Sequence, residues 1–184
     1  MLNNPLRSLF SFFRTVVSGA LLLFIFFSTT IIAKGADAPP GWSGIGGSGA
    51  NDIYAVGEYG AIARFDGKKW VSIKTGSRIW FSGIVSFSPT EVFAAGYKGT
   101  ILHFNGHRWN EMETTVTNDL NGIWGSSPDN LYAVGDRGTI LHFDGARWSL
   151  VPTGSDNLLF AFWGSAPDNL YAAGGRSTLL HYYG

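Results

Sequence analysis

The sequence predicts an all-β protein built as an array of four sheets, and three observations lead to that prediction. A 39-residue unit is repeated almost four times in a constant register. Each copy consists of short apolar runs separated by turn residues, and no run has a helical period. The composition is 45% hydrophobic and only 14% charged, which suits strands with both faces buried. A fixed period of this size is typical of folds whose neighbouring units share their cores.

Glycines and aromatic residues mark the register of the repeat. We expect blades at about 42–80, 81–119, 120–158 and 159–184, within a repeat domain spanning 39–184, with the last blade incomplete. The residues that recur at intervals of 39 are Gly57, Gly96, Gly135 and Gly174; Tyr54, Phe93, Tyr132 and Tyr171; and Trp70, Trp109 and Trp148, without a fourth tryptophan.

The third copy shows how one unit folds. It predicts strands near 120–125, 130–135, 139–143 and 147–152, the last two joined by a hairpin at Asp144-Gly145. In the second strand both faces are apolar, which is typical of a strand packed on two sides. The two faces carry Tyr132 and Val134 on one side and Leu131 and Ala133 on the other. Four such antiparallel strands in about 40 residues describe the blade of a β-propeller.

The segments WGSSPDNLYAVG (124–135) and GTILHFDGARW (138–148) resemble bacterial extracytoplasmic propeller repeats, relatives of the kelch-like and neuraminidase-repeat propellers. The resemblance covers residues 42–184 and implies a propeller fold. It does not imply sialidase activity. The neuraminidase motif S-x-D-x-G-x-x-W places the aspartate five residues before the tryptophan, whereas Asp144 lies four before Trp148 and is followed directly by glycine.

Residues 1–38 have the pattern of a targeting segment. Arg7 and Arg14 precede an uncharged run over 15–33, and small residues follow. This order is typical of a secretory signal peptide. The run is also close to the length that crosses a bilayer, so an uncleaved N-terminal anchor helix is the alternative. Either interpretation predicts that the repeats are extracytoplasmic, secreted or periplasmic, with a membrane anchor through 15–33 in the second case.

Charge and cysteine content exclude several classes of function. The formal net charge is 0, so no electrostatic field favours nucleic acid. The chain contains no cysteine, which excludes disulfides and thiolate metal sites.

The fourth copy ends at 181–184, before the position of a tryptophan-bearing fourth strand. An array of this kind would expose apolar faces and a strand edge. Three arrangements follow from this: a four-bladed ring with one thin blade, a homodimer in which two chains complete a ring near eight blades, or a piece of a longer propeller.

Recurring histidines and acids suggest catalytic or metal sites, but their spacing favours structural roles. His103, His142 and His181 lie on separate blades, on the order of 10 Å apart, whereas zinc needs its nitrogens at ~2.1 Å. We therefore expect each histidine to pack between blades with one ring nitrogen hydrogen-bonded, and we predict no metal and no cofactor. The carboxylates in turns are Asp52, Glu91, Asp129 and Asp168 in the first turn, Glu58 and Asp136 in the second, and Asp66 and Asp144 in the third.

The turns between the second and third strands differ most among the copies, and loops on a rigid scaffold often carry function. We predict that this loop face binds a protein or glycan ligand without catalysis. The rival hypothesis is a glycan-processing enzyme that uses Glu58, Asp136, Asp119 and Asp156. Simple drift at solvated turns is the remaining alternative. The predicted binding residues are Glu58, Tyr59, Tyr97, Lys98, Asp136, Arg137 and Arg176, to which the inter-blade loops add Arg78, Trp80, Asn118, Asp119, Asp156 and Asn157.

Overall fold

The structure is a computed structural model that describes residues 41–183. The predicted signal peptide or anchor at 1–38 lies outside these residues. Over the described range, no helix has the length and apolar character needed to cross a membrane.

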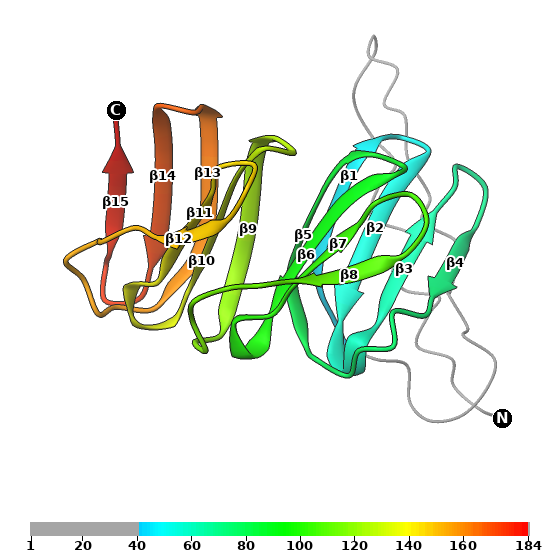
Figure 1. Ribbon diagram of the computed structural model, residues 1–184, viewed down its shortest axis with the longest axis horizontal. Coiled ribbons are helices and arrows are strands. Elements are labelled where there is room, and N and C mark those ends of the chain that lie inside the picture. Colours follow the sequence, from blue (N-terminus) through cyan, green and yellow to red (C-terminus); the bar gives the residue numbers. More distant parts are fainter. Residues whose placement is uncertain (1–40, 184) are drawn as a thin grey trace, which may run out of the picture. The chain divides into compact units, whose positions relative to one another are not determined.

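The described chain forms four antiparallel sheets in chain order (Figure 1). Each sheet is formed by consecutive strands, and we call the sheets blades 1 to 4. Blade 1 contains β1 (Trp42–Gly49), β2 (Asp52–Gly57), β3 (Ile62–Phe65) and β4 (Trp70–Ile73). Blade 2 contains β5 (Phe81–Ser88), β6 (Glu91–Gly96), β7 (Ile101–Phe104) and β8 (Trp109–Met112). Blade 3 contains β9 (Leu120–Ser127), β10 (Asn130–Gly135), β11 (Ile140–Phe143) and β12 (Trp148–Leu150). Blade 4 contains β13 (Leu159–Ala166), β14 (Asn169–Gly174) and β15 (Leu179–Tyr182).

The strands predicted for the third copy are confirmed with small shifts at their ends. The second predicted strand has the bounds of β10, and the third loses only Thr139. The fourth is shorter than predicted, because only Trp148, Ser149 and Leu150 pair with β11. The Val151 amide still donates to the Ile140 carbonyl at 2.8 Å, but Pro152 has no amide hydrogen with which to extend the ladder.

Both faces of blade 3 are buried against its neighbours, as the two apolar faces of β10 predict. Leu131 and Ala133 belong to a buried cluster that includes Phe93 and Ile101 of blade 2. Val134 belongs to another cluster, which includes residues of blade 4. The core therefore lies between successive sheets.

The first strands of the blades lie side by side, β1 against β5, β5 against β9 and β9 against β13. Glycine makes this close approach possible. A Cβ on Gly44 would lie 2.5 Å from the Ser82 carbonyl oxygen, and one on Gly83 would lie 2.9 Å from the Ile123 nitrogen. The equivalent residue of blade 3 is Gly122, whereas blade 4 carries Ala161. The fourth copy thus differs at a position that, in the other three, accommodates the next blade.

The hairpins between third and fourth strands owe their shape to an aspartate or asparagine. Asp144 Oδ1 accepts hydrogen bonds from the Arg147 and Ala146 amides at 2.9 and 3.0 Å, and Gly145 adopts a φ of 89°. These amide donors lower the pKa of Asp144, and the Lys69 and Lys68 amides lower the pKa of Asp66 in the same way. The predicted hairpin at Asp144-Gly145 is confirmed.

Apolar side chains are exposed on the outer faces of both end blades. Ile45 of blade 1 is 72% exposed and Leu179 of blade 4 is 70% exposed. Residues of the same repeat positions are buried inside the array, since Ile84 and Ile101 belong to its clusters. These two outer faces are therefore built like blade-to-blade interfaces.

Candidate functional site

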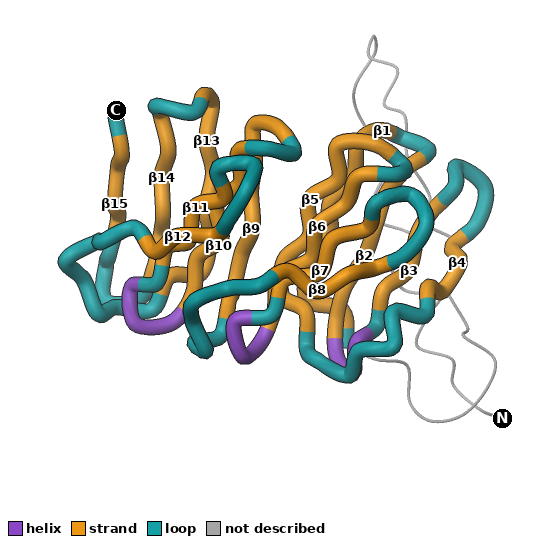
Figure 2. Tube along the Cα trace, viewed as in Figure 1, coloured by secondary structure: helices purple, strands orange, loops and turns teal. Residues whose placement is uncertain are grey.

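One end of the sheets gathers the turns that join second and third strands and the connections that lead from blade to blade (Figure 2). Short 3₁₀ turns occupy Glu58–Gly60, Tyr97–Gly99 and Asp136–Gly138. The Gly60 amide donates to the Ile79 carbonyl at 2.8 Å, and the Gly138 amide donates to the Asn157 carbonyl at 2.7 Å. Both kinds of loop therefore lie on one face of the blades. We call it the turn face.

Each 3₁₀ turn is held by hydrogen bonds on two sides. In blade 3, the Asp136 amide donates to the Asp119 carbonyl at 3.0 Å, on the connection that enters the blade. The Gly138 amide bonds the connection that leaves it. In blade 2, the Lys98 amide donates to Asp119 Oδ1 at 2.8 Å. Rigid loops of this kind lose little entropy when they bind a ligand.

The middle residue of each turn has a left-handed backbone although it is not glycine. The φ angles are 55° at Tyr59, 58° at Lys98 and 55° at Arg137, and Arg176 has a φ of 52° in blade 4. Such conformations cost on the order of 1–3 kcal/mol and persist where the surrounding structure enforces them, often at functional sites. All four are predicted site residues.

The structure divides the seven predicted binding residues into two groups. The four left-handed residues are exposed, Tyr59 at 79%. The three first-position residues, Glu58, Tyr97 and Asp136, are half-buried and already engaged. The predicted residues therefore share one face, but within residues 41–183 only the left-handed group has exposed side chains without a hydrogen-bond partner.

The first-position contacts brace the turns. Glu58 Oε2 accepts a hydrogen bond from the Gly41 amide at 3.1 Å. Tyr97 stacks on Trp80, with ring centroids 5.3 Å apart and planes 12° from parallel. The Trp80 indole N–H in turn donates to Ser43 Oγ at 3.1 Å. Trp80, predicted as a binding residue, therefore has a structural contact.

Asp136 is tied into the contact between blades 3 and 4. Its Oδ1 accepts a hydrogen bond from Asn121 Nδ2 at 2.9 Å, and the same nitrogen donates to the Leu159 carbonyl at 2.9 Å. Ser43, at the equivalent position of blade 1, donates to the Phe81 carbonyl of blade 2 at 2.5 Å. Blade 4 has Phe160 at this position, so its outer side lacks the polar link to a following blade.

A hollow of about 270 Å³ lies on the turn face beside Arg137. Its polar lining includes Asn118, Thr139, Thr153 and Asp156. Asn118 Nδ2 is bound to Thr139 Oγ1 at 2.8 Å, so that wall is fixed. Over residues 41–183, no hydrogen bond or ion pair engages the Arg137 guanidinium, which is free to bind a ligand there.

In blades 2 to 4, a histidine of the third strand is hydrogen-bonded to the first residue of the second strand. Each of their Nε2 atoms is hydrogen-bonded, to Glu91 from His103 at 2.5 Å, to Asn130 from His142 at 2.7 Å and to Asn169 from His181 at 2.9 Å. The rings stack on Phe93, Tyr132 and Tyr171. The predicted hydrogen bond of each ring is confirmed.

The grouping of the first-turn acids was wrong by one residue. The 39-residue period relates Asp52 and Glu91 to Asn130 and Asn169, not to Asp129 and Asp168. Those asparagines are the residues that bind the histidines. Counting the period through the turn identifies them, whereas grouping by residue type does not.

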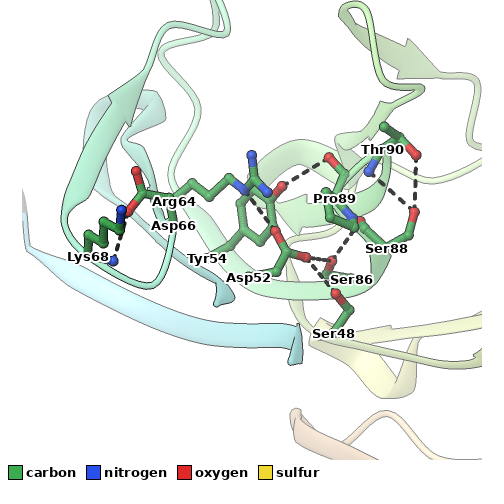
Figure 3. Close-up of polar contacts among 10 residues, drawn as sticks. All are labelled: Ser48, Asp52, Tyr54, Arg64, Asp66, Lys68, Ser86, Ser88, Pro89 and Thr90. Atoms are coloured by element: carbon green, nitrogen blue, oxygen red, sulfur yellow. Dashed lines mark hydrogen bonds and ion pairs between the residues drawn. The ribbon is translucent and has the colours of Figure 1, made fainter. Parts of the chain in front are cut away.

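Blade 1 replaces the histidine by Arg64, whose Nε donates to Asp52 Oδ1 at 2.7 Å (Figure 3). Asp52 Oδ2 also accepts from Ser48 at 2.6 Å and from Ser86 of blade 2 at 3.1 Å. Burial alone would raise the pKa of Asp52, but the bonds from Ser48, Arg64 and Ser86 together lower it. Asp52 is therefore a structural anion between two blades.

In the part of the chain that the structure describes, no three histidine, cysteine, aspartate or glutamate side chains are grouped to hold a metal ion.

Comparison with known proteins supports the fold. No protein-family model matches the sequence, and no curated protein matches it. Among solved structures, "YCF48 bound to D1 peptide" superposes with a TM-score of 0.60 at 15% identity, over 74% of this chain and 47% of that one. YCF48 from Cyanidioschyzon merolae gives 0.60 at 16% identity, over 78% and 53%. The chain thus spans about half the length of these structures. The likeness and the four antiparallel sheets show that the described chain has a β-propeller fold.

Proposed function

We propose that this protein is a propeller scaffold that binds a partner protein through its turn face, without catalysis. The observation that carries the proposal is the row of exposed left-handed residues, Tyr59, Lys98, Arg137 and Arg176. Hydrogen-bonded turns hold the first three in fixed positions. A structurally similar propeller, YCF48, has been solved bound to a D1 peptide, which makes a protein ligand the first one to test.

The chemistry of these side chains indicates the kind of partner. Lys98, Arg137 and Arg176 are cations, and Tyr59 is an exposed aromatic residue. Arginine and tyrosine are enriched at binding hot spots, and arginine binds carboxylates through two parallel hydrogen bonds. A partner segment with carboxylates, aspartate, glutamate or a C-terminus, fits the hollow beside Arg137.

The absence of catalysis is part of the proposal. A glycosidase needs two carboxyl groups that converge at ~5 to 9.5 Å on the sugar. Two of the four acids considered for that role already serve the scaffold, since Glu58 accepts from Gly41 and Asp136 accepts from Asn121. These contacts support a structural role for both.

The test is binding of the full chain to an array of acidic, neutral and basic peptides. We expect selective capture of acidic peptides, weakened roughly tenfold by Arg137→Ala, as for one lost charged hydrogen-bond pair. Arg147→Ala is the matched control, because Arg147 is exposed in the same blade but lies on a hairpin between third and fourth strands. Equal binding by both variants, or no preference for acidic peptides, would contradict the proposal.

Three finer features belong to this proposal. Export as a secreted or periplasmic protein, with or without an anchor through 15–33, is supported by the charge and hydropathy pattern of residues 1–38. A glycan in place of the protein partner is the second ligand class, and a glycan array with the same two variants tests it. The kelch-like and bacterial extracytoplasmic relationship is supported by the repeat motifs.

Assembly of two chains into one ring is a further element of the proposal. The apolar residues exposed on the outer faces of blades 1 and 4 support it, because contiguous apolar patches favour association. A contact between two chains would differ from the internal ones, since Phe160 and Ala161 stand where the other blades have a polar residue and a glycine.

A further inference from the structure

The fourth strands of blades 2 and 3 each begin with a tryptophan that fills a groove against the preceding blade. Trp148 is buried and packs 5.2 Å from the Phe143 ring, in a cluster that includes Phe93 and Ile101 of blade 2. Trp109 packs 5.4 Å from Phe104 against the cluster of blades 1 and 2. We call the groove that receives such a ring the indole seat.

The lining of the indole seat recurs between blades 3 and 4, where it surrounds a cavity of about 170 Å³. Besides His142, the residues that line this cavity are Tyr132, Ile140, Val151, Phe162, Leu170 and Tyr182. Their counterparts 39 residues earlier surround Trp148 in its cluster: Phe93, Ile101, Met112, Ile123, Leu131 and Phe143. The repeat therefore identifies this cavity as the indole seat of blade 4.

The size and polarity of the cavity fit one aromatic ring. An apolar cavity of about 150 Å³ binds benzene in an engineered protein. A neighbouring cavity of about 200 Å³ shares five of the six residues and extends along blade 4 to Ala172 and Leu180. Within residues 41–183, the indole N–H groups of Trp109 and Trp148 have no hydrogen-bond partner. The seat thus selects an aromatic ring by shape.

The edge of β15 supplies the main-chain groups for a strand that would carry such a ring. In blade 3, Trp148 pairs with Phe143, Ser149 with His142 and Leu150 with Leu141. The same register in blade 4 places an aromatic residue opposite Tyr182. Tyr182 is 52% exposed, whereas Phe143 is 8% exposed. Among the described residues β15 pairs only with β14, and an unpaired edge is a template for an added strand.

We propose that the groove between blades 3 and 4 binds an extended peptide of a partner protein, added to β15 as a fourth strand and anchored by an aromatic side chain in the indole seat. The fourth strands of the chain define the motif of the ligand. They read Trp-x-x-Ile, Trp-x-x-Met and Trp-x-x-Val at 70–73, 109–112 and 148–151. In blade 2, Met112 of the motif pairs with Ile101. Leu179 is the residue of blade 4 that is equivalent to Ile101, so the aliphatic residue of the bound peptide would cover Leu179 on the outer face.

Every tryptophan of residues 1–184 lies in a strand or connection of the four blades, so we choose a separate peptide as the ligand. Residues 1–40 contain no tryptophan. A second copy could supply the ring only by inserting its own Trp109 or Trp148 into this groove. Both side chains belong to packed clusters, so their removal would open a blade of that copy. This site is distinct from the turn face, and its ligand is recognised by an apolar groove and a strand edge instead of by cations.

The test uses a fluorescein-labelled peptide with the sequence GARWSLVPT, the chain's own residues 145–153, titrated with the full chain and followed by anisotropy. We expect saturable binding that weakens roughly ten- to hundredfold when the peptide tryptophan is replaced by alanine, the effect of removing one buried aromatic side chain. Methylation of the peptide amides that face β15 is also expected to weaken binding. Equal binding of the tryptophan and alanine peptides, or no saturable binding, would overturn the proposal.

Two matched variants locate the site. Val151→Phe adds volume at the wall of both cavities and is expected to abolish binding, whereas Val71→Phe makes the same change on β4 and is expected to leave it intact. A thermal melt verifies that each variant is folded, and the peptide comparison on the unchanged chain is independent of both variants. Equal loss in both variants would overturn the proposed location. Concentration-dependent self-association that excludes the peptide would identify a second copy as the occupant and overturn the choice of partner.

Discussion

The Arg64 guanidinium of β3 donates a hydrogen bond to the Asp52 carboxylate of β2 at 2.7 Å, at the repeat position where the other three blades pair a histidine with glutamate or asparagine. Among the four equivalent pairs in the described residues, only the Arg64–Asp52 pair also has a hydrogen bond to the next blade, which Ser86 donates to Asp52. It links the stability of blade 1 to that of blade 2.

This relationship predicts how stability depends on pH in acid. Because the folded pKa of Asp52 is below its ordinary value of 3.8, its contribution to stability is complete above pH 3.8. The contribution is lost as the pH falls below 3.8 through the lower folded pKa. We expect Asp52→Asn to lower the free energy of unfolding at pH 7 by about 1.5–3 kcal/mol, since hydrogen bonds to a charge are lost.

Denaturant unfolding at pH 7 and in steps below pH 4 measures this effect. Asp52→Asn is expected to flatten the acid slope as well as to lower stability. Asp156→Asn, at an exposed position on a connection, is the control and is expected to change neither quantity. The same acid slope in Asp52→Asn and the unchanged chain would count against the assigned role.

Tyr54 predicts a corresponding effect in base. Burial, followed by the charge of Asp52, raises the pKa of Tyr54 to about 12 from the model-compound value of 10.0. Its protonated form is favoured in the folded state, so its contribution is present below pH 10 and is lost as the pH rises toward 12. Tyr54→Phe is expected to flatten the stability profile between these values, whereas Tyr59→Phe, at an exposed residue, is expected to leave it unchanged. Absorbance at alkaline pH, which follows tyrosine ionisation, provides the direct reading.

The contact between first strands predicts an unequal response of two glycines on β1. Gly44→Ala places a Cβ 2.5 Å from the Ser82 carbonyl oxygen, so we expect a loss of about 1–3 kcal/mol from overpacking. Gly49→Ala adds a Cβ with no atom within 4 Å, and we expect little change. Thermal melts of the two variants compare them directly. A similar melting temperature for both would show that the blades can move apart without loss of stability.

The left-handed turns predict that binding and stability can be separated at Arg137. Arg137→Gly removes the steric strain of a side chain on a left-handed backbone, but glycine loses more conformational entropy on folding. Because these two effects offset each other, we expect a free energy of unfolding within about 1 kcal/mol of the unchanged chain. Arg137→Val places a β-branched residue at a φ of 55° and is expected to lower stability by about 1 kcal/mol or more. Chemical denaturation distinguishes the two. Acidic-peptide binding is expected to weaken in both variants.

The exposed outer faces predict the assembly state. If two chains associate through blades 1 and 4, light scattering of the full chain will give the mass of two chains, and Leu179→Ser will reduce it to one. Leu150→Ser changes another exposed leucine, on β12, and is expected to preserve the larger mass. A single-chain mass at all concentrations would contradict assembly of the ring from two copies.

Much of the fold could be predicted because the 39-residue period repeats the local signals. Proline, glycine and aspartate place the turns, and the two apolar faces of β10 indicate packing on both sides. The period also locates the turn face, because antiparallel strands bring alternate turns to the same end of a sheet. The shortened β12 could not be predicted, since its length depends on how many residues pair with β11.

Side-chain partners were less accessible to sequence reasoning. The role of Asn130 depends on its proximity to His142, which lies twelve residues away and becomes a neighbour only when β10 and β11 pair. Glu58, Tyr97 and Asp136 each precede an exposed binding residue directly in the sequence, but their contacts with Gly41, Trp80 and Asn121 come from distant segments. Variation among copies identified the turn and could not distinguish its braced residues from its exposed ones.

The substitutions of the fourth copy make the outer face of blade 4 differ from the faces between the other blades, which matters for engineering a longer array. Ala161, Phe160 and Ser177 replace the glycine, polar residue and second glycine with which the first three blades adjoin their successors. A 39-residue cassette duplicated between blades 1 and 3 would meet surfaces shaped for it, whereas one appended after blade 4 would meet added side chains. Lengthening this propeller by gene duplication should therefore succeed upstream of residue 159 and require compensating mutations downstream of it.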